Sequence, residues 1–233
     1  MAIHQFTVRD VVRETPRAVI VRLEAGPGKL SYKAGQAAMV GLAGRPARQP
    51  YSIASPPEAY RQRGVLEFLV EVRPGGRFGP HLRGVRPGRR VEVEGPVGGF
   101  VLPRTRRREM LFVAGGTGIA PLRAMITSAL AGPRAPGISL LYSARTPKEF
   151  AFRRELTGAA RRGRLRLCLT ATREHGSSWR GRTGRIQQTW IDALAKGRSP
   201  LCFVCGPEPF VVTMIAMLRE AGVPARDIRR ERY

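Results

Sequence analysis

The sequence contains few cysteines and no long hydrophobic run, and both absences narrow the choice of protein class. Three cysteines are too few for a disulfide framework or for an iron–sulfur cluster with four cysteine ligands, so we expect no metal site. No apolar run approaches the roughly 18 residues of a membrane helix. The N-terminus, MAIHQFTVRD, lacks the apolar core of a secretory signal. We therefore expect a cytoplasmic protein with no membrane contact.

Acidic residues are also scarce, at 17 against 41 lysines and arginines, which gives a net charge of +24. A chain this basic raises the question of nucleic-acid binding. Aromatic residues make up only 7% of the chain and do not alternate with the arginines. We also find no helix-turn-helix or RNA-binding signature, so the composition favours an acidic protein partner over a nucleic acid. Only four of the basic residues are lysines, so an arginine-rich genome composition would explain the bias equally well.

The first 103 residues have the pattern of an all-β domain. Apolar and acidic residues alternate over 66–72 and again over 91–94, which predicts half-buried strands. Short strands separated by turn residues are typical of a small antiparallel β-barrel. Residues 102–109 contain a proline and four arginines and break this pattern, so we place a domain boundary between 103 and 104. The other strands expected in this part are 4–12, 18–23 and 36–42.

From Met110 onward, apolar strands alternate with segments of helical periodicity. This alternation predicts a parallel, doubly wound α/β sheet over residues 104–233, in which ligands bind at the carboxyl ends of the strands. The expected strands are 110–114, 138–143, 165–172, 200–205 and 227–233, and the expected helices are 122–130, 148–162, 186–195 and 210–218.

The stretch MLFVAGGTGIAPL combines a buried strand, a glycine turn and a helix start. Such a unit directs the free N–H groups of the first helical turn at an anion. Pro121 fits that first turn, where its missing N–H has no cost, although it stands where the pattern GxGxxG has its third glycine. The turn alone is a weak signal, because tight turns without a ligand have the same glycines.

Four motifs occur in an order that is more specific than any one of them. Together with the expected barrel and parallel sheet, they resemble the ferredoxin–NADP⁺ reductase family of flavoproteins. The resemblance covers nearly the whole chain and implies a flavin on residues 1–103 and a nicotinamide nucleotide on residues 104–233. The motifs are Pro50-Tyr51-Ser52-Ile53-Ala54-Ser55, Gly95-Pro96, Gly115-Gly116-Thr117-Gly118-Ile119-Ala120-Pro121 and Cys205-Gly206-Pro207.

On the flavin side, the resemblance places Tyr51 against the ring and the Ser52 hydroxyl near the ring nitrogen that accepts hydride. Gln49 stands where the family has an arginine for the phosphates, and we expect the adjacent Arg48 to take that role. We expect FAD rather than FMN. The implied flavin residues are Arg48, Tyr51, Ser52, Gly75, Gly76 and Gly79.

The segment from Gly75 to Leu82 resembles the glycine-rich turn that meets the flavin pyrophosphate. The family commonly has serine or threonine where Gly79 stands, so one hydroxyl contact is missing. A plain hairpin loop is the alternative interpretation of this segment. We expect His81 to be a structural residue rather than a catalytic base.

On the nucleotide side, the pair Thr172-Arg173 resembles the position that meets the adenosine 2′-phosphate, which favours NADPH over NADH. A solvated arginine is the alternative. Cys205 resembles the cysteine near the nicotinamide carbon and is expected to position rather than react, whereas Cys168 and Cys202 are expected in the core. The implied nucleotide residues are Gly116, Thr117, Gly118, Pro121, Arg145, Thr172, Arg173, Cys205, Gly206, Pro207 and Tyr233.

The last three residues of the sequence are Glu231-Arg232-Tyr233. In plant-type members of the family a terminal tyrosine stacks on the flavin, and a glutamate lies near the same site. An aromatic residue at a sheet edge is the alternative for Tyr233. The catalytic residues implied by the resemblance are Ser52, Cys205, Glu231 and Tyr233.

The leading hypothesis is an FAD-dependent NAD(P)H oxidoreductase. Hydride would pass from nicotinamide to flavin, and electrons would continue to an acidic acceptor such as a ferredoxin, a flavodoxin or an oxygenase component. Gln49 and Gly79 keep a second hypothesis open, a non-catalytic subunit or binding module on the same scaffold.

Overall fold

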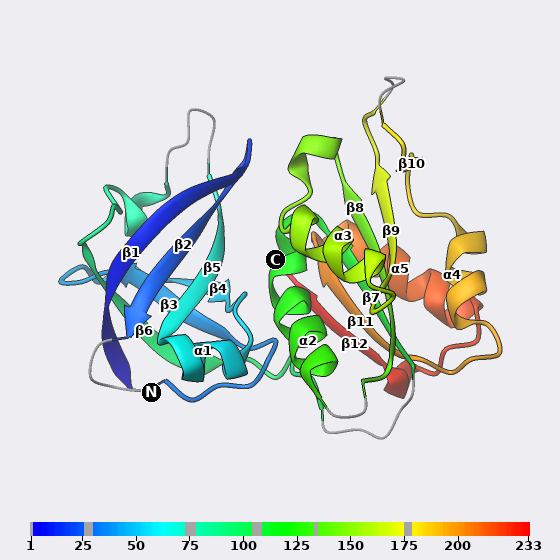
Figure 1. The fold of residues 1–233 in the computed structure, drawn as a ribbon, viewed down its shortest axis with the longest axis horizontal. Helices are drawn as coiled ribbons and strands as arrows, with labels where there is room; N and C mark the ends of the chain where they lie inside the picture. Colours follow the sequence, from blue (N-terminus) through cyan, green and yellow to red (C-terminus); the bar gives the residue numbers. More distant parts are fainter. Residues whose placement is uncertain (1, 26–29, 73–77, 104–108, 133–134, 175–178) are drawn as a thin grey trace. The chain divides into compact units, whose positions relative to one another are not determined.

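The computed structural model describes residues 2–25, 30–72, 78–103, 109–132, 135–174 and 179–233. The chain divides into two compact units. The first consists of residues 1–103 and 123–128, and the second of residues 104–122 and 129–233. The described part of each unit contains one six-stranded sheet (Figure 1).

The sheet of the first unit has the strand order β4-β3-β6-β1-β2-β5, with every neighbouring pair antiparallel. Ile53, directly after β4, forms an antiparallel bridge to Phe68 in β5 and so joins the two edges. Closing the sheet in this way produces a barrel, which confirms the predicted antiparallel β-barrel. The strands are β1 Ile3–Thr15, β2 Ala18–Ala25, β3 Ala37–Leu42, β4 Gln49–Ser52, β5 Val65–Glu71 and β6 Arg90–Val97.

The barrel interior follows from the alternation seen in the sequence. Leu66, Phe68 and Val70 of β5 are at most 2% exposed, and they join one apolar core with side chains from the other strands. Two short helical segments, α1 Pro57–Arg63 and η1 Pro80–Leu82, contribute buried side chains to this unit. Full burial of a leucine, valine or phenylalanine side chain contributes about 1.5–3 kcal/mol to the free energy of folding.

The second sheet has the order β10-β9-β8-β7-β11-β12, and all its pairs are parallel. This confirms the predicted doubly wound sheet. The strands are β7 Glu109–Gly115, β8 Gly137–Ala144, β9 Arg166–Ala171, β10 Arg182–Thr183, β11 Leu201–Gly206 and β12 Ile228–Arg232. The helical segments are η2 Gly116–Gly118, α2 Ile119–Ala131, η3 Pro147–Glu149, α3 Arg153–Arg161, α4 Gln188–Ala195, α5 Glu208–Glu220 and η4 Ala225–Asp227.

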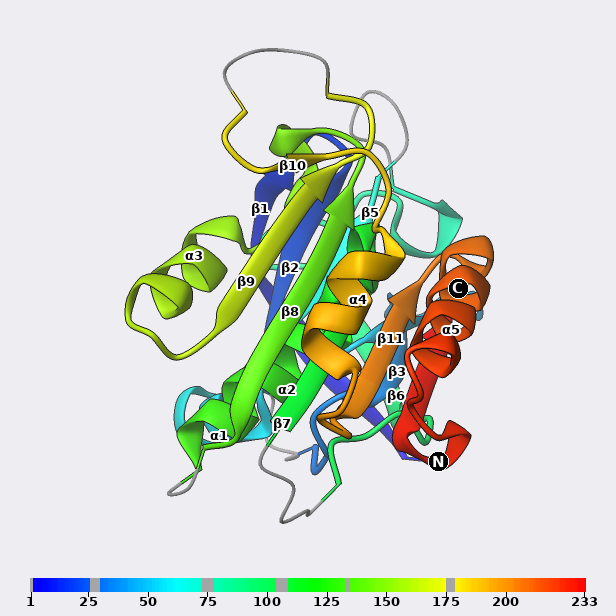
Figure 2. The same ribbon diagram turned by 90° about the vertical axis from the view of Figure 1, so that its right-hand side faces the viewer.

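Helices α4 and α5 cover one face of this sheet (Figure 2). Leu111 and Val113 of β7 form a single apolar core there with Ile191 of α4 and Val211 of α5. Among the described residues, every helix is too short or too polar to span a lipid bilayer.

The helix expected over 148–162 is wrong as a continuous element. It is divided into η3 and α3, with a break at Phe150–Phe152. Thr146 and Glu149 form a capping box around η3, and Phe152 adopts a left-handed backbone with φ of 56°. Phe150 and Phe152 are both buried. Burial of these two rings therefore outweighs the helical preference of the flanking residues.

Candidate functional site

Strand β4 presents the Tyr51-Ser52 pair at an edge of the barrel sheet, where both side chains are half-buried. Backbone hydrogen bonds fix the two residues that follow this pair. The Ile53 N–H donates to Gln36 O at 2.9 Å, and the Ala54 N–H donates to Glu67 O at 2.8 Å. The motif is therefore part of the barrel wall rather than a loose loop.

The Tyr51 phenol contacts His81, which follows Gly79 in η1. The phenolic oxygen lies 2.7 Å from His81 Nε2, and the two rings are 5.6 Å apart. Burial raises the pKa of Tyr51 to about 12 and lowers the pKa of His81. His81 is only 4% exposed, and its other nitrogen, Nδ1, has no hydrogen-bond partner among the described residues. Its burial agrees with the expected structural role, but sequence reasoning did not find its contact with Tyr51.

Arg48 lies where its guanidinium meets the carboxylate of Glu92 in β6. Its Nε is buried and has no partner in the described part of the chain. Glu92 therefore competes with any flavin phosphate for the Arg48 guanidinium, while the Nε–H donor has no partner among the described residues. Gln49, the residue that replaces the family arginine, is exposed.

Gly79 precedes η1, whereas Gly75 and Gly76 lie outside the described residues. The backbone of Gly79 has φ of −61° and ψ of 167°, a conformation open to any residue. A Cβ at this position would lie 2.9 Å from His81 Cε1 and 3.1 Å from His81 Nδ1. Space beside the imidazole, rather than backbone conformation, therefore favours glycine here.

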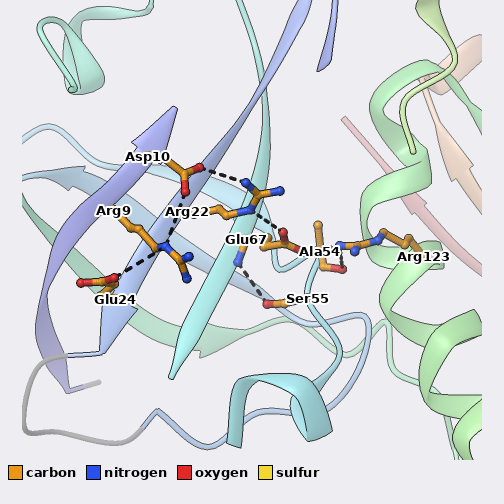
Figure 3. A network of polar contacts seen from close by, with 8 residues as sticks. All are labelled: Arg9, Asp10, Arg22, Glu24, Ala54, Ser55, Glu67 and Arg123. Atoms are coloured by element: carbon orange, nitrogen blue, oxygen red, sulfur yellow. Dashed lines mark hydrogen bonds and ion pairs between the residues drawn. The ribbon is translucent and has the colours of Figure 1, made fainter. Parts of the chain in front are cut away.

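A chain of charged groups holds the end of the same motif (Figure 3). Arg123, in the part of α2 that belongs to the first unit, donates to the Glu67 carboxylate and to Ala54 O. Arg22 binds the other carboxylate oxygen of Glu67 at 2.8 Å. Burial disfavours ionisation of Glu67, but the charges of Arg123 and Arg22 outweigh it, so the pKa of this carboxyl lies below its usual value. Sequence reasoning missed this network, because Arg123 lies 56 positions from Glu67.

In the second unit, the glycine turn packs directly against the end of β11. A Cβ at Gly118 would lie 2.3 Å from Cys205 O, and a Cβ at Gly115 would lie 2.9 Å from the Phe210 ring. Gly116 has φ of 57°, a left-handed conformation that favours glycine. Two of these three glycines are thus required by close packing, and Gly116 by its conformation.

The Tyr233 phenol occupies the turn. Its oxygen accepts hydrogen bonds from Thr117 Oγ1 at 3.0 Å and from the Gly118 N–H at 3.2 Å, and it donates to Gly115 O at 2.9 Å. The side chain is nonetheless 59% exposed. The turn therefore presents an O–H and an N–H that converge on a single oxygen. Tyr233 lies beyond β12 and binds this turn, a contact that neither expected role included; its stacking on a flavin stays a prediction.

Cys205 and Glu231 are paired in the parallel register of β11 and β12. Burial, followed by the charge of Glu231, raises the pKa of the Cys205 thiol. The thiol therefore stays protonated, as its expected positioning role requires. Cys202 is fully buried in the core, as expected, whereas Cys168 is only half-buried.

Arg145 and Arg173 stand at the carboxyl ends of neighbouring strands. The Arg173 N–H donates to Arg145 O at 2.7 Å, and the Thr172 N–H donates to Ala144 O at 2.9 Å. Both arginine side chains are exposed. The structure thus makes Arg145 and Arg173 backbone neighbours at adjoining strand ends, each with an exposed side chain.

Sequence reasoning also missed an aromatic chain behind this edge. Trp179 stacks on Phe150 at 5.5 Å, and Phe150 meets the edge of Tyr142 at 5.0 Å. The Tyr142 hydroxyl donates to Gly116 O at 3.1 Å. Tyr142 therefore supports the glycine turn through its hydroxyl. The sequence signal for this contact is a tyrosine within an otherwise apolar strand, directly before Ser143.

Comparison with known proteins finds matches over both units. Residues 5–102 match the family model of an oxidoreductase FAD-binding domain, and residues 112–216 match that of an oxidoreductase NAD-binding domain. The chain is 34% identical to a ferredoxin–NADP reductase B of Sorangium cellulosum, over 82% of this chain and 80% of that protein. It is 30% identical to the xylene/toluene monooxygenase electron transfer component XylA of Pseudomonas putida, over 92% of this chain but only 61% of that protein.

Solved structures show the same fold. The cytochrome P450 reductase GcoB of Amycolatopsis matches with a TM-score of 0.85 at 26% identity, over 99% of this chain and 70% of that one. A ferredoxin NADP⁺ reductase from Neisseria gonorrhoeae with bound FAD and NADP matches with a TM-score of 0.81 at 19% identity, over 100% and 99%.

Proposed function

The chain belongs to the ferredoxin reductase-like family of FAD-dependent NAD(P)H oxidoreductases, and we propose that it passes electrons from NADPH to an acidic electron-transfer protein. Bound FAD would supply the chemistry of hydride uptake from the nicotinamide and of electron release to the acceptor. The residues of the chain then have to bind, orient and shield the two cofactors. This membership favours the enzyme over the non-catalytic module that Gln49 and Gly79 had left open.

Residues 1–103 are the proposed flavin domain, and their chemistry fits FAD. Tyr51 and Ser52 are both half-buried. The ring of Tyr51 would supply an aromatic wall for the planar flavin, and the Ser52 hydroxyl would hydrogen-bond the flavin nitrogen that takes up hydride. The buried Arg48 Nε–H, which has no partner in the described part of the chain, would be available to a phosphate oxygen. Gly75, Gly76 and Gly79 are the residues proposed to contact the flavin pyrophosphate, and of these only Gly79 lies in the described part of the chain.

Residues 104–233 are the proposed nucleotide domain, and one observation carries this assignment. The Thr117 hydroxyl and the Gly118 N–H converge on one oxygen, that of Tyr233. The same two donors suit an oxygen of the nicotinamide nucleotide at the start of a helix. Gly116 and Pro121 complete the proposed turn, and Cys205 and Gly206 at the end of β11 pack against it. We include Pro207, which follows β11, and Glu231, the β12 partner of Cys205, in the proposed site.

NADPH is the proposed coenzyme because Arg145 and Arg173 stand side by side at the strand ends. Two guanidinium groups with Thr172 suit a 2′-phosphate dianion, which NADH lacks. In this proposal Tyr233 leaves the turn when the nucleotide arrives, because both need the same donors.

An acidic acceptor is proposed from the charge balance. Residues 1–103 carry 16 basic against 8 acidic residues, and residues 104–233 carry 25 against 9, so both domains are positive. Such a charge accelerates association with an acidic protein and is screened over about 10 Å at 0.1 M salt. A ferredoxin, a flavodoxin or an oxygenase component would each fit.

The test begins with the purified chain and FAD. We expect a yellow protein that binds FAD and is reduced by NADPH; a chain that takes up neither FAD nor FMN overturns the proposed function. Electron transfer to an acidic ferredoxin should fall steeply as salt rises, while reduction of a small uncharged quinone should change little. An equal response of both activities would place the effect of salt on the nucleotide step or on the fold.

A further inference from the structure

His81 contains a buried nitrogen with nothing to bind in the described structure. The side chain is 4% exposed, its Nε2 contacts the Tyr51 phenol, and its Nδ1 has no partner among the described residues. A buried polar atom without a hydrogen bond loses its contacts with water and gains nothing in exchange. Such an atom beside a ligand-binding motif points to a missing partner.

The imidazole fills the space that a side chain at position 79 would need. A Cβ at Gly79 would meet His81 Cε1 at 2.9 Å and Nδ1 at 3.1 Å, although the backbone there would accept any residue. Nδ1 therefore faces the position at which a serine or threonine hydroxyl would begin. Gly79 and His81 occupy one shared volume, and only one of them can carry a side chain into it.

The contact with Tyr51 determines what Nδ1 can offer. If the phenol donates to Nε2, a neutral imidazole carries its proton on Nδ1, which becomes a donor. The opposite tautomer would leave Nδ1 as a bare lone pair, which an anion does not bind. Only the first arrangement satisfies an anion, and it forms an unbroken chain from phenol to imidazole to anion.

We propose that His81 is a flavin-phosphate ligand: its Nδ1–H donates to a phosphate oxygen of FAD, in place of the hydroxyl that Gly79 lacks. This assignment rests on the flavin site of the proposed function. It adds a second role to the residue, because the same imidazole holds the Tyr51 phenol through Nε2. One imidazole then links the phosphate contact, through Nδ1, with the position of the Tyr51 ring, through Nε2.

The first experiment is a flavin titration of the apoprotein, followed by fluorescence, with FAD, FMN and riboflavin. His81→Phe keeps the ring volume and loses both nitrogens, and Tyr51→Phe removes only the phenol contact. We expect His81→Phe to bind FAD and FMN about tenfold to a hundredfold more weakly, the range for one hydrogen bond to a charged group. Riboflavin has no phosphate and should lose no more affinity than it does in Tyr51→Phe.

Two results of this titration would overturn the assignment. Equal losses for riboflavin and FAD would mean that His81 acts only through Tyr51. Unchanged FAD affinity in His81→Phe would show that His81 does not bind a flavin phosphate. The proposal that residues 1–103 bind the flavin would still stand. Wild-type protein that binds no flavin would overturn the proposed function and this assignment with it.

The second experiment uses the shared volume. Gly79→Ser alone should weaken FAD binding, because its Cβ displaces the imidazole. In the double variant with His81→Ala, the same serine has room and supplies a hydroxyl, so FAD affinity should recover above that of His81→Ala alone. A serine that has the same effect in both backgrounds would contradict the assignment. The ¹⁵N shifts of His81 should also show Nδ1 protonated in the FAD complex, and an Nε2-protonated ring would refute the tautomer.

Discussion

Replacement of Arg173 by alanine is expected to raise the KM for NADPH about tenfold to a hundredfold and to leave the KM for NADH nearly unchanged. The backbone bond from Arg173 N to Arg145 O puts the two residues on adjacent strand ends, which are separated by about 4.8 Å in a sheet. A hydrogen bond to a charged group contributes about 1.5–3 kcal/mol, and each 1.4 kcal/mol is a factor of about ten. NADH has no phosphate at this position and loses nothing.

The adjacency of the two arginines makes the prediction sharper. If both guanidinium groups hold one phosphate, Arg145→Ala should have a loss of the same kind, and the double variant should lose less than the product of the two. Steady-state kcat/KM for NADPH and NADH, with an uncharged quinone as acceptor, measures the ratio. Arg161→Ala is the matched control, because it removes the same charge from an exposed arginine that is the last residue of α3 and lies at neither strand end.

Equal losses for both coenzymes would refute this reasoning, because they would show that Arg173 supports the fold or a part that the two coenzymes share. A loss in Arg161→Ala as large as that in Arg173→Ala would refute it differently, by showing that overall charge attracts NADPH and that no local phosphate contact is needed.

Two further predictions concern Glu67 and Tyr233. Glu67→Gln should lose about 1.5–3 kcal/mol of stability at neutral pH; because the pKa of Glu67 is depressed, the wild-type advantage should persist above about pH 4.5 and vanish as pH falls through the lower folded value. Thermal unfolding of both proteins across pH checks this, and a difference that stays constant with pH would contradict it. Tyr233→Phe should lower the KM for NADPH about two- to fivefold, because exposed hydrogen bonds worth about 0.5–1 kcal/mol no longer compete for the turn; an unchanged or higher KM in steady-state assays would show that the phenol does not block the nucleotide.

The sequence predicted the order of the elements well, because their periodicity reflects which face is buried. The alternation at Leu66 to Val70 and the glycine turn after β7 are both local signals, and both led to the observed element. The break at Phe150–Phe152 was missed for the opposite reason. Helical spacing continues through it, and only the tertiary burial of both phenylalanines makes the left-handed turn favourable.

The candidate site was predictable only where its residues are close together in the sequence. Tyr51 and Ser52, or Thr117 and Gly118, are recognised as pairs. The contacts of His81 with Tyr51 and of Glu67 with Arg123 join residues 30 and 56 positions apart. Their chemistry becomes visible only when the barrel closes, since neither histidine nor glutamate in a strand or turn indicates its partner.

The packing of Gly118 on Cys205 O and of Gly115 and Gly206 on the Phe210 ring limits how this protein can be redesigned. These five positions lie on two segments about 90 residues apart, yet they share one volume, because protein interiors are packed as densely as organic crystals. A library that varies the glycine turn alone would return mostly misfolded variants, whereas one that varies it together with position 210 would have space to exchange. Coenzyme engineering is therefore better directed at the exposed Arg145 and Arg173, where a change of charge displaces no backbone.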